Sequence, residues 1–234
     1  MTQAPSGQRV NTDSCVFGAV IGPDYLTGNQ PKSIIDIGTG TGVLALMLAV
    51  RFPDCKITGV EPETSIAAVA TQNFEASPWR DRLVVKSLRA QDLDPKELGL
   101  FDFVICNPPY FQNSMLSTDR QRAVARHNSD LSPDELYASM TRMMTEGGQA
   151  WLSFPHDSTD LWMDSGRRAG LNPTHEIIVK DHPDAKPHMS IVGWSRTRPE
   201  SVINEIIFYR SEAKGGMSQW MLDFRTKWYP VRFN

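Results

Sequence analysis

Short apolar runs alternate with amphipathic stretches along the first two thirds of the chain, and this alternation predicts strands that take turns with helices. We expect strands at 33–37, 56–60, 82–87, 101–106 and 148–154. We expect helices at 42–52, 62–74 and 131–144, the last opened by the helix-start signal Ser132-Pro133-Asp134-Glu135. Alternation of this kind predicts an α/β fold with a mainly parallel sheet and helices on both of its faces.

After Gly147-Gly148 the pattern changes to strand-rich sequence. Further strands are expected at 174–180, 188–194 and 202–209, followed by a helix over 218–227. There is no repeat, low-complexity tract or long linker. We therefore expect one domain over residues 1–234, with a flexible leader at 1–12 and a basic, aromatic appendage at 196–234.

Composition narrows the class of protein. The chain has 234 residues, of which 40% are hydrophobic, which suits a globular domain with a sizeable core. No run reaches the roughly 18 apolar residues of a membrane helix, and the polar start has no secretory signal. The sequence thus predicts a cytoplasmic protein. Cys15, Cys55 and Cys106 are odd in number and far apart, so we expect buried thiols and neither disulfides nor a metal site.

Charge leaves the question of a nucleic-acid partner open. The net charge of −3 argues against a protein that binds nucleic acid over its whole surface. The segment 196–234 nevertheless carries seven basic and four acidic residues. It is either a solvated charged surface or a patch that faces RNA.

A glycine-rich turn follows the first predicted strand, in the sequence Asp36-Ile37-Gly38-Thr39-Gly40-Thr41-Gly42. Glycines let the backbone turn tightly and approach a ligand closely. The spacing differs from the GxGxxG pattern that binds a pyrophosphate at a helix N-terminus. S-adenosylmethionine has no phosphate but carries an amine, so an acid such as Asp36 beside that amine makes chemical sense.

Further residues complete this predicted cofactor site. Glu61 ends the second strand, where ribose-binding acids lie in nucleotide-binding βαβ units. Asp92 is our candidate for holding the cofactor's adenine, and Thr12 and Asp13 are candidates for covering the pocket. A protein that binds another nucleotide, or an inactive relative, remains an alternative.

The fourth strand runs directly into Asn107-Pro108-Pro109-Tyr110. The nitrogen of an adenine or amide group has its lone pair delocalised, so a catalyst must hold both N–H groups and turn the lone pair toward an electrophile. The Asn107 side-chain carbonyl and the Pro108 carbonyl can accept those hydrogens, and Tyr110 can stack on a base. Asn107 also lies where it would border the cofactor.

A long polar loop over 111–130 follows this motif. Loops of such length in a compact domain are usually functional. Arg120, Arg122 and Arg126 are positioned to contact phosphates beside a target base, although a solvated loop is the alternative.

These features together resemble the bacterial tRNA1(Val) adenine-37 N6-methyltransferase family, from about residue 10 to residue 233. The resemblance rests on Thr12-Asp13, Gly18-Ala19, DIGTGTGVLALMLA at 36–49, Glu61, Ser77-Pro78-Trp79, NPPY at 107–110, Arg122, Arg126 and the aromatic-basic segment 220–233. It implies a Rossmann-like class I methyltransferase fold with a seven-stranded, mostly parallel sheet and an antiparallel edge strand. It also implies S-adenosylmethionine as cofactor and a tRNA as partner.

Other substrates share the same chemistry. NPPY also occurs in enzymes that methylate protein glutamine, and in enzymes that methylate adenines of ribosomal RNA or DNA. A non-catalytic cofactor-binding protein is a further alternative. We expect a monomer that uses no metal ion and no membrane.

Overall fold

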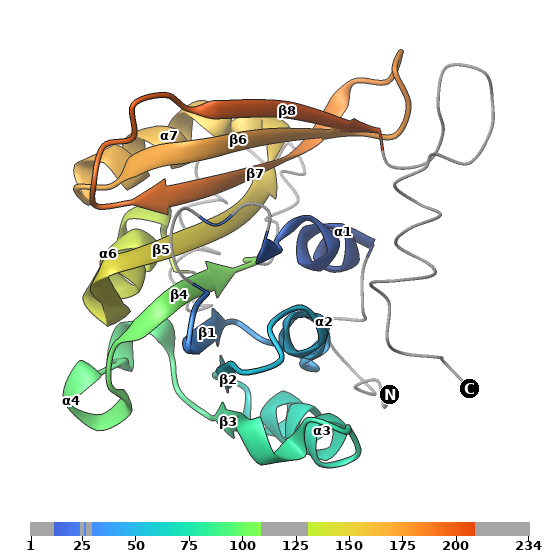
Figure 1. Cartoon of the computed structure of the whole chain (residues 1–234), viewed down its shortest axis with the longest axis vertical. Helices are drawn as coiled ribbons and strands as arrows, with labels where there is room; N and C mark the ends of the chain where they lie inside the picture. Colours follow the sequence, from blue (N-terminus) through green and yellow to red (C-terminus); the bar gives the residue numbers. More distant parts are fainter. Residues whose placement is uncertain (1–11, 24–25, 27–29, 109–130, 209–234) are drawn as a thin grey trace, which may run out of the picture.

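The computed structural model describes residues 12–23, 26, 30–108 and 131–208, which form an eight-stranded sheet in the order β3-β2-β1-β4-β5-β7-β6-β8 (Figure 1). The strands are β1 (Ser33–Ile37), β2 (Lys56–Val60), β3 (Leu83–Lys86), β4 (Phe101–Cys106), β5 (Met144–Pro155), β6 (Asn172–Lys180), β7 (Pro187–Ser195) and β8 (Ile203–Phe208). Strand order reverses between β1 and β4, and ligands of open α/β sheets bind beyond the carboxyl ends of strands at such a point.

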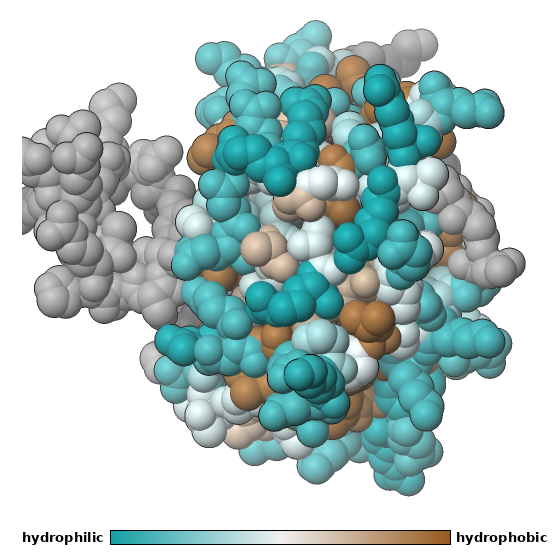
Figure 2. All heavy atoms as spheres, turned by 90° about the vertical axis from the view of Figure 1, so that its left-hand side faces the viewer, coloured by the Kyte–Doolittle hydropathy of each residue, from teal (hydrophilic) through white to brown (hydrophobic). Residues whose placement is uncertain are grey.

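Helices cover both faces of the sheet, as the alternating pattern predicts (Figure 1). The helices are α1 (Thr12–Val20), α2 (Val43–Arg51), α3 (Thr64–Glu75), α4 (Pro95–Leu98), α6 (Pro133–Met143) and α7 (Thr159–Arg168), with short 3₁₀ turns η2 (Arg80–Arg82), η3 (Ala90–Asp92) and η4 (His156–Ser158). One buried cluster joins α1, α2 and α3 to one face of the sheet, and a second joins α6 and α7 to the other. Seen from the α6 and α7 side, the surface is largely hydrophilic with scattered apolar spots (Figure 2).

The sheet requires two corrections to the expectation of seven strands with an antiparallel strand at the edge. It has eight strands, and the antiparallel one, β7, lies inside the sheet between β5 and β6. The short connection over 181–186 allows β7 only to turn back as a hairpin, because a parallel return needs a crossover of a dozen or more residues. The additional edge is β8, which pairs parallel to β6 and corresponds to the strand predicted at 202–209.

Some boundaries also differ from the prediction. The helix predicted at 131–144 is α6, and it begins with the expected capping box between Ser132 and Glu135. It passes directly into β5 at Met144, so that the strand begins earlier than the predicted residue 148 and includes both Gly147 and Gly148. The register against β4 shifts there, which is typical of glycine at a bulge.

Helices α1 and α7 were not anticipated. The buried face of α7 consists of Trp162, Met163 and the small residues Ser165 and Gly166, which leaves too few apolar positions to stand out in a polar sequence. The leader 1–11, the loop 109–130 and the predicted helix 218–227 lie outside the described residues.

Candidate active site

The glycine-rich turn leaves β1 and leads into α2, as predicted. Gly38, Gly40 and Gly42 all have positive φ angles, of 76°, 56° and 87°, a conformation that side chains disfavour. The backbone N–H groups of Gly38 and Thr39 both donate to the Val60 carbonyl, at 2.8 and 2.9 Å, which fixes the turn against the end of β2. A Cβ on Gly38 would meet no atom within 4 Å, so this face of the turn is open to a ligand. By contrast, a Cβ on Gly42 would lie 2.5 Å from the Phe74 ring.

Asp36, which we expect beside the amine of the cofactor, is buried next to the glycine-rich turn, and its contact with the cofactor stays a prediction. Its carboxylate is buried, accepts a hydrogen bond from Thr39 Oγ1 at 2.7 Å and another from the backbone N–H of Ala45. Burial raises the pKa of Asp36 to about 7, while the bond from Thr39 lowers it and the nearby Glu61 raises it further. The described contacts of Asp36 therefore support the turn and the first turn of α2, which has no side-chain cap of its own.

Glu61 lies at the end of β2, beside the glycine-rich turn. Its Oε2 accepts from the backbone N–H of Gly40 and its Oε1 from that of Glu63, both at 3.1 Å. Burial raises the pKa of Glu61, and these two backbone bonds oppose the rise. A carboxylate offers about four acceptor positions, so each oxygen can accept one further bond from a neighbouring diol.

An apolar cavity of about 140 Å³ lies between the carboxyl ends of β1, β2 and β4. Its walls include Ile37, Gly38, Val60, Leu88, Ala90, Cys106, Pro108 and Leu131. Apolar walls next to a buried acid and an open glycine suit a flat heterocycle joined to a ribose.

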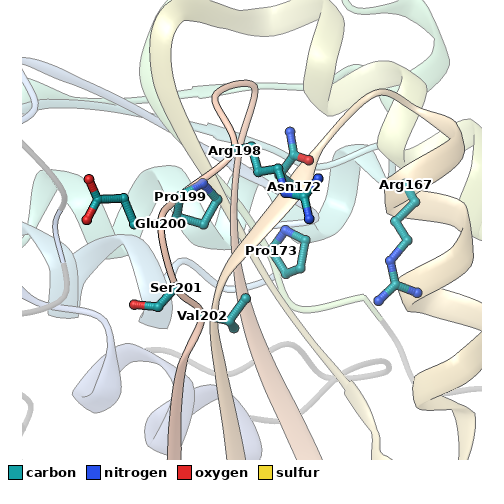
Figure 3. Close-up of a pocket in the computed structure, with 8 residues that line it drawn as sticks. All are labelled: Arg167, Asn172, Pro173, Arg198, Pro199, Glu200, Ser201 and Val202. Carbon is teal, nitrogen blue, oxygen red and sulfur yellow. The ribbon is translucent and has the colours of Figure 1, made fainter.

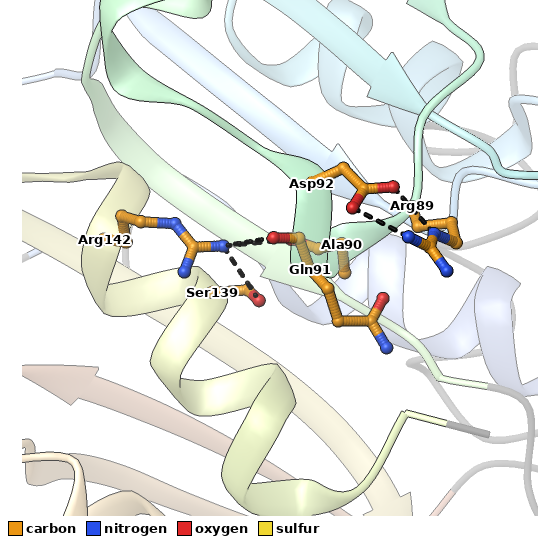
Figure 4. Close-up of polar contacts among 6 residues, drawn as sticks. All are labelled: Arg89, Ala90, Gln91, Asp92, Ser139 and Arg142. Atoms are coloured by element: carbon orange, nitrogen blue, oxygen red, sulfur yellow. Dashed lines mark hydrogen bonds and ion pairs between the residues drawn. The ribbon is translucent and has the colours of Figure 1, made fainter. Parts of the chain in front are cut away.

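One wall of this cavity, formed by residues 88–91, is fixed from behind by Arg142 of α6 (Figure 4). The Arg142 guanidinium donates to the carbonyls of Leu93 at 2.9 Å, Gln91 at 3.1 Å and Ala90 at 3.3 Å. Asp92, our candidate for holding the cofactor's adenine, is not among the residues that line the cavity. Its carboxylate pairs with Arg89 at 2.7 Å (Figure 4).

Asn107 follows β4 and is held at both ends of its side-chain amide. Nδ2 donates to Ser14 Oγ of α1, and Oδ1 accepts from Ser153 Oγ of β5, each at 2.6 Å. The next residue, Pro108, lines the apolar cavity. The predicted cofactor site and the predicted amine-binding site therefore adjoin at the carboxyl end of β4.

Thr12 and Asp13 begin α1, the helix that supplies Ser14. Thr12 is exposed, and Asp13 Oδ1 lies 3.8 Å from His188 Nε2 of β7. Burial raises the pKa of Asp13, His188 lowers it, and Asp181 raises it. Neither Thr12 nor Asp13 lines the apolar cavity. Their expected role in covering the cofactor stays a prediction.

Five predicted site residues, Pro109, Tyr110, Arg120, Arg122 and Arg126, lie outside the described residues. The site also contains residues that sequence reasoning missed, namely Ser14, Ser153 and Arg142. Ser153 left a readable signal, since it is the one polar residue in the apolar run 150–154 of β5. Ser14 directly follows the Thr12-Asp13 pair, and Arg142 left no signal because it contacts residues 90–93 through their backbone carbonyls.

A second cavity, of about 370 Å³, lies where β6 and β8 begin (Figure 3). Arg167, Asn172 and Arg198 are among its walls. It borders the amino ends of strands that run parallel to β5, whereas Asn107 and the glycine turn lie at carboxyl ends. None of the predicted site residues lines it.

Comparison with known proteins decides between the alternatives for the family. The methyltransferase small domain family matches residues 21–134. A tRNA1(Val) (adenine(37)-N6)-methyltransferase from Vibrio parahaemolyticus is 39% identical over 207 residues, which cover 88% of this chain and 84% of that relative. One from Bacteroides fragilis is 30% identical and covers 86% and 85%. The chain belongs to the tRNA1(Val) (adenine(37)-N6)-methyltransferase family. The resemblance inferred from the motifs is thereby confirmed.

Solved structures confirm the class I methyltransferase fold. A predicted O-methyltransferase from Agrobacterium tumefaciens covers 90% of this chain and 94% of its own, with a TM-score of 0.65 and 18% identity. A glycopeptide N-methyltransferase solved with S-adenosylmethionine covers 80% and 93%, with a TM-score of 0.53 and 15% identity. At these identities the likeness concerns the fold.

Three further observations concern the described residues. Cys15, Cys55 and Cys106 are buried free thiols, as expected. Among residues 12–108 and 131–208, where described, no cluster of three or more His, Cys, Asp or Glu side chains could hold a metal ion. None of the helices in these ranges has the length and apolar character that crossing a bilayer requires.

Proposed function

We propose that this protein transfers the methyl group of S-adenosylmethionine to the N6 atom of adenine 37 in a tRNA. The observation that carries the proposal is the position of Asn107, whose amide is held beside the cavity wall formed by Pro108. Family membership supports the same reaction, since the relatives from Vibrio and Bacteroides carry the name of this activity.

The cavity and its surroundings fit the cofactor. Glu61 can accept both ribose hydroxyls while it keeps its bonds to the backbone of Gly40 and Glu63. The apolar walls can enclose the adenine, and the open side of Gly38 leaves room for the methionine part. When bound, S-adenosylmethionine supplies an electrophilic methyl group on a sulfonium. The predicted contact of Asp92 with the cofactor's adenine stays a proposal.

Asn107 and Pro108 would prepare the target nitrogen. Asn107 Oδ1 and the Pro108 carbonyl each accept one N6 hydrogen, which draws the nitrogen toward tetrahedral geometry and directs its lone pair at the methyl group. The amine becomes acidic only as the new bond forms, so no general base has to act first. The acceleration then comes mainly from positioning and from aimed dipoles.

The target adenine must leave its stack to reach this site, which costs a few kcal/mol. Stacking on Tyr110 would return roughly 1–3 kcal/mol. Arg120, Arg122 and Arg126 would contact the phosphates beside the extruded base and make binding sensitive to salt.

We also propose that the chain is one domain that acts as a monomer in the cytoplasm and without a metal ion. One continuous sheet through the described residues supports a single domain. Light scattering coupled to gel filtration tests the monomer, since a mass near twice 26.2 kDa would contradict it.

The proposed reaction is tested by incubating the protein with labelled S-adenosylmethionine and a valine tRNA transcript. The matched control is the same transcript with guanine at position 37. We expect N6-methyladenosine in the first digest and none in the second. Label in both digests would place the target at another position of the tRNA. A third reaction contains a release factor as a protein substrate, and label in that protein alone would favour glutamine methylation.

A further inference from the structure

Asn107 is the residue on which the proposed chemistry depends, and the structure connects it to two serines that are distant in sequence. Ser14 lies 93 positions earlier, on α1, and Ser153 lies 46 positions later, on β5. Each hydroxyl lies 2.6 Å from one end of the Asn107 amide. Two separate elements, α1 and β5, therefore converge on this one side chain at the end of β4.

An asparagine amide needs such support because its two ends differ in chemistry but hardly in shape. The torsion that turns the amide is broad and roughly two-fold, so a free side chain rotates widely and exchanges its oxygen with its nitrogen. Only the oxygen can accept a hydrogen from the target amine. Any time that the nitrogen spends in its place is unproductive.

The Ser153 hydroxyl is placed in a strand where a polar group is otherwise unfavourable. Its side chain is fully buried, between Leu152 and Phe154, which are fully buried as well. Burying a hydroxyl costs free energy unless it forms a hydrogen bond. Within the described part of the chain, Asn107 is the partner that satisfies it.

The two contacts leave the catalytic position of Asn107 open. Ser153 donates to Oδ1 and takes one of its two lone pairs, so the second remains available for an N6 hydrogen. Ser14 accepts from Nδ2 and holds that end toward α1. The amide dipole is then oriented before the substrate arrives, and no reorganisation is needed during the reaction.

We propose that Ser14 and Ser153 are positioning residues, which fix the plane of the Asn107 amide so that Oδ1 meets the target amine. The inference rests on the proposed function and deepens it. The two hydroxyls would raise the rate of methyl transfer without contributing to the binding of the cofactor or the RNA.

The test compares Ser153→Ala and Ser14→Ala with two matched variants. Ser14→Thr keeps a hydroxyl at position 14. Ser190→Ala removes an equally buried hydroxyl from β7, at the position that pairs with Phe154, where its bonds go to His156 and Thr159. For each protein one measures kcat and KM with tRNA, the Kd of S-adenosylmethionine by calorimetry, and the melting temperature.

We expect kcat to fall roughly 10- to 100-fold in each of Ser153→Ala and Ser14→Ala, because small misplacements of a catalytic group have effects of this size. KM and cofactor Kd should stay within about twofold, since an interaction lost in the transition state alone lowers kcat without changing binding. Ser14→Thr should restore most of kcat, and Ser190→Ala should resemble the wild type.

Two results would overturn the inference. One is a kcat within about twofold of Ser190→Ala in both alanine variants. The other is a fall in kcat that points to a structural role. Such a fall is not restored by Ser14→Thr, or it is accompanied by a lower melting temperature or by weaker cofactor binding. If Ser153→Ala fails to fold, the half-buried Ser14 carries the test. An active wild type with unimpaired serine variants refutes the inference alone, whereas a wild type that methylates no RNA adenine refutes both proposals.

Discussion

The proposed cofactor site and the proposed amine-binding site adjoin at the carboxyl end of β4, but they are built in different ways. On the cofactor side, the backbone forms most of the site. Three glycines have positive φ, and backbone N–H groups bond to Glu61 and Val60. On the amine side, one side-chain amide is held by two hydroxyls. A backbone site depends on a continuous stretch of chain and is visible as a motif. A side-chain site depends on residues that only the fold brings together.

The largest expected effect is on the amine side. Asn107→Ala removes one of the two acceptors that we propose for the target nitrogen, and loss of one such positioned group typically costs about 10²–10³ in kcat. Cofactor binding should stay nearly intact, because the cavity walls and Glu61 are unchanged. A radiolabel transfer assay and calorimetry measure the two quantities. The exposed Asn204→Ala is the control, and full activity of Asn107→Ala would end the proposed role.

On the cofactor side, Glu61→Ala should have the opposite signature. Hydrogen bonds to a charged acceptor contribute about 1.5–3 kcal/mol, so we expect the Kd of S-adenosylmethionine to rise roughly 10- to 100-fold. At saturating cofactor, kcat should change far less. The control is Glu63→Ala, which keeps the backbone N–H that bonds to Glu61. Equal Kd values in the two variants would contradict a ribose contact.

Asp36, next to the proposed cofactor site, makes the stability of the protein depend on pH. Burial raises the pKa of Asp36 from its usual value of 3.8 to about 7. Between these values the folded state holds the proton and the unfolded state has lost it, so the free energy of unfolding falls as pH rises. The isosteric Asp36→Asn variant lacks this term. Its stability relative to the wild type should therefore increase from pH 4 to pH 7, by up to about 1.4 kcal/mol per unit. A constant difference in urea titrations would refute a buried, neutral Asp36.

The smallest expected effect concerns the cavity wall at residues 88–91. Arg142→Met removes the hydrogen bonds that fix this wall from behind, so the Kd of S-adenosylmethionine should rise roughly three- to tenfold, as for one or two ordinary hydrogen bonds. The kcat at saturating cofactor should not change. Arg168→Met, which removes an exposed ion pair with Asp134, is the control. A fall in kcat with an unchanged Kd would indicate that Arg142 affects methyl transfer and not cofactor binding, which would contradict this prediction.

The same contrast explains how much could be predicted from the sequence. The parallel strands β1 to β4, the glycine turn and Glu61 were predicted because their signals are local and periodic. The prediction of an antiparallel strand at the edge of the sheet was wrong, because the pattern of a strand does not reveal which strands it pairs with. The burial of Asp36 and its hydrogen bond from Thr39 could not be read from the motif, because both depend on how the turn packs. Ser14 and Ser153 contact Asn107 only through the packing of α1 and β5 around β4.

The central claim is that one target nitrogen fits between Asn107 and the cofactor. It is tested most directly by a crystal structure with a conjugate that joins the N6 atom of adenosine to the methionine part of the cofactor. We predict the N6 nitrogen within about 3 Å of both Asn107 Oδ1 and the Pro108 carbonyl oxygen, with the cofactor ribose on Glu61. A conjugate bound with its N6 atom away from Asn107, or with its ribose outside the glycine turn, would contradict the account.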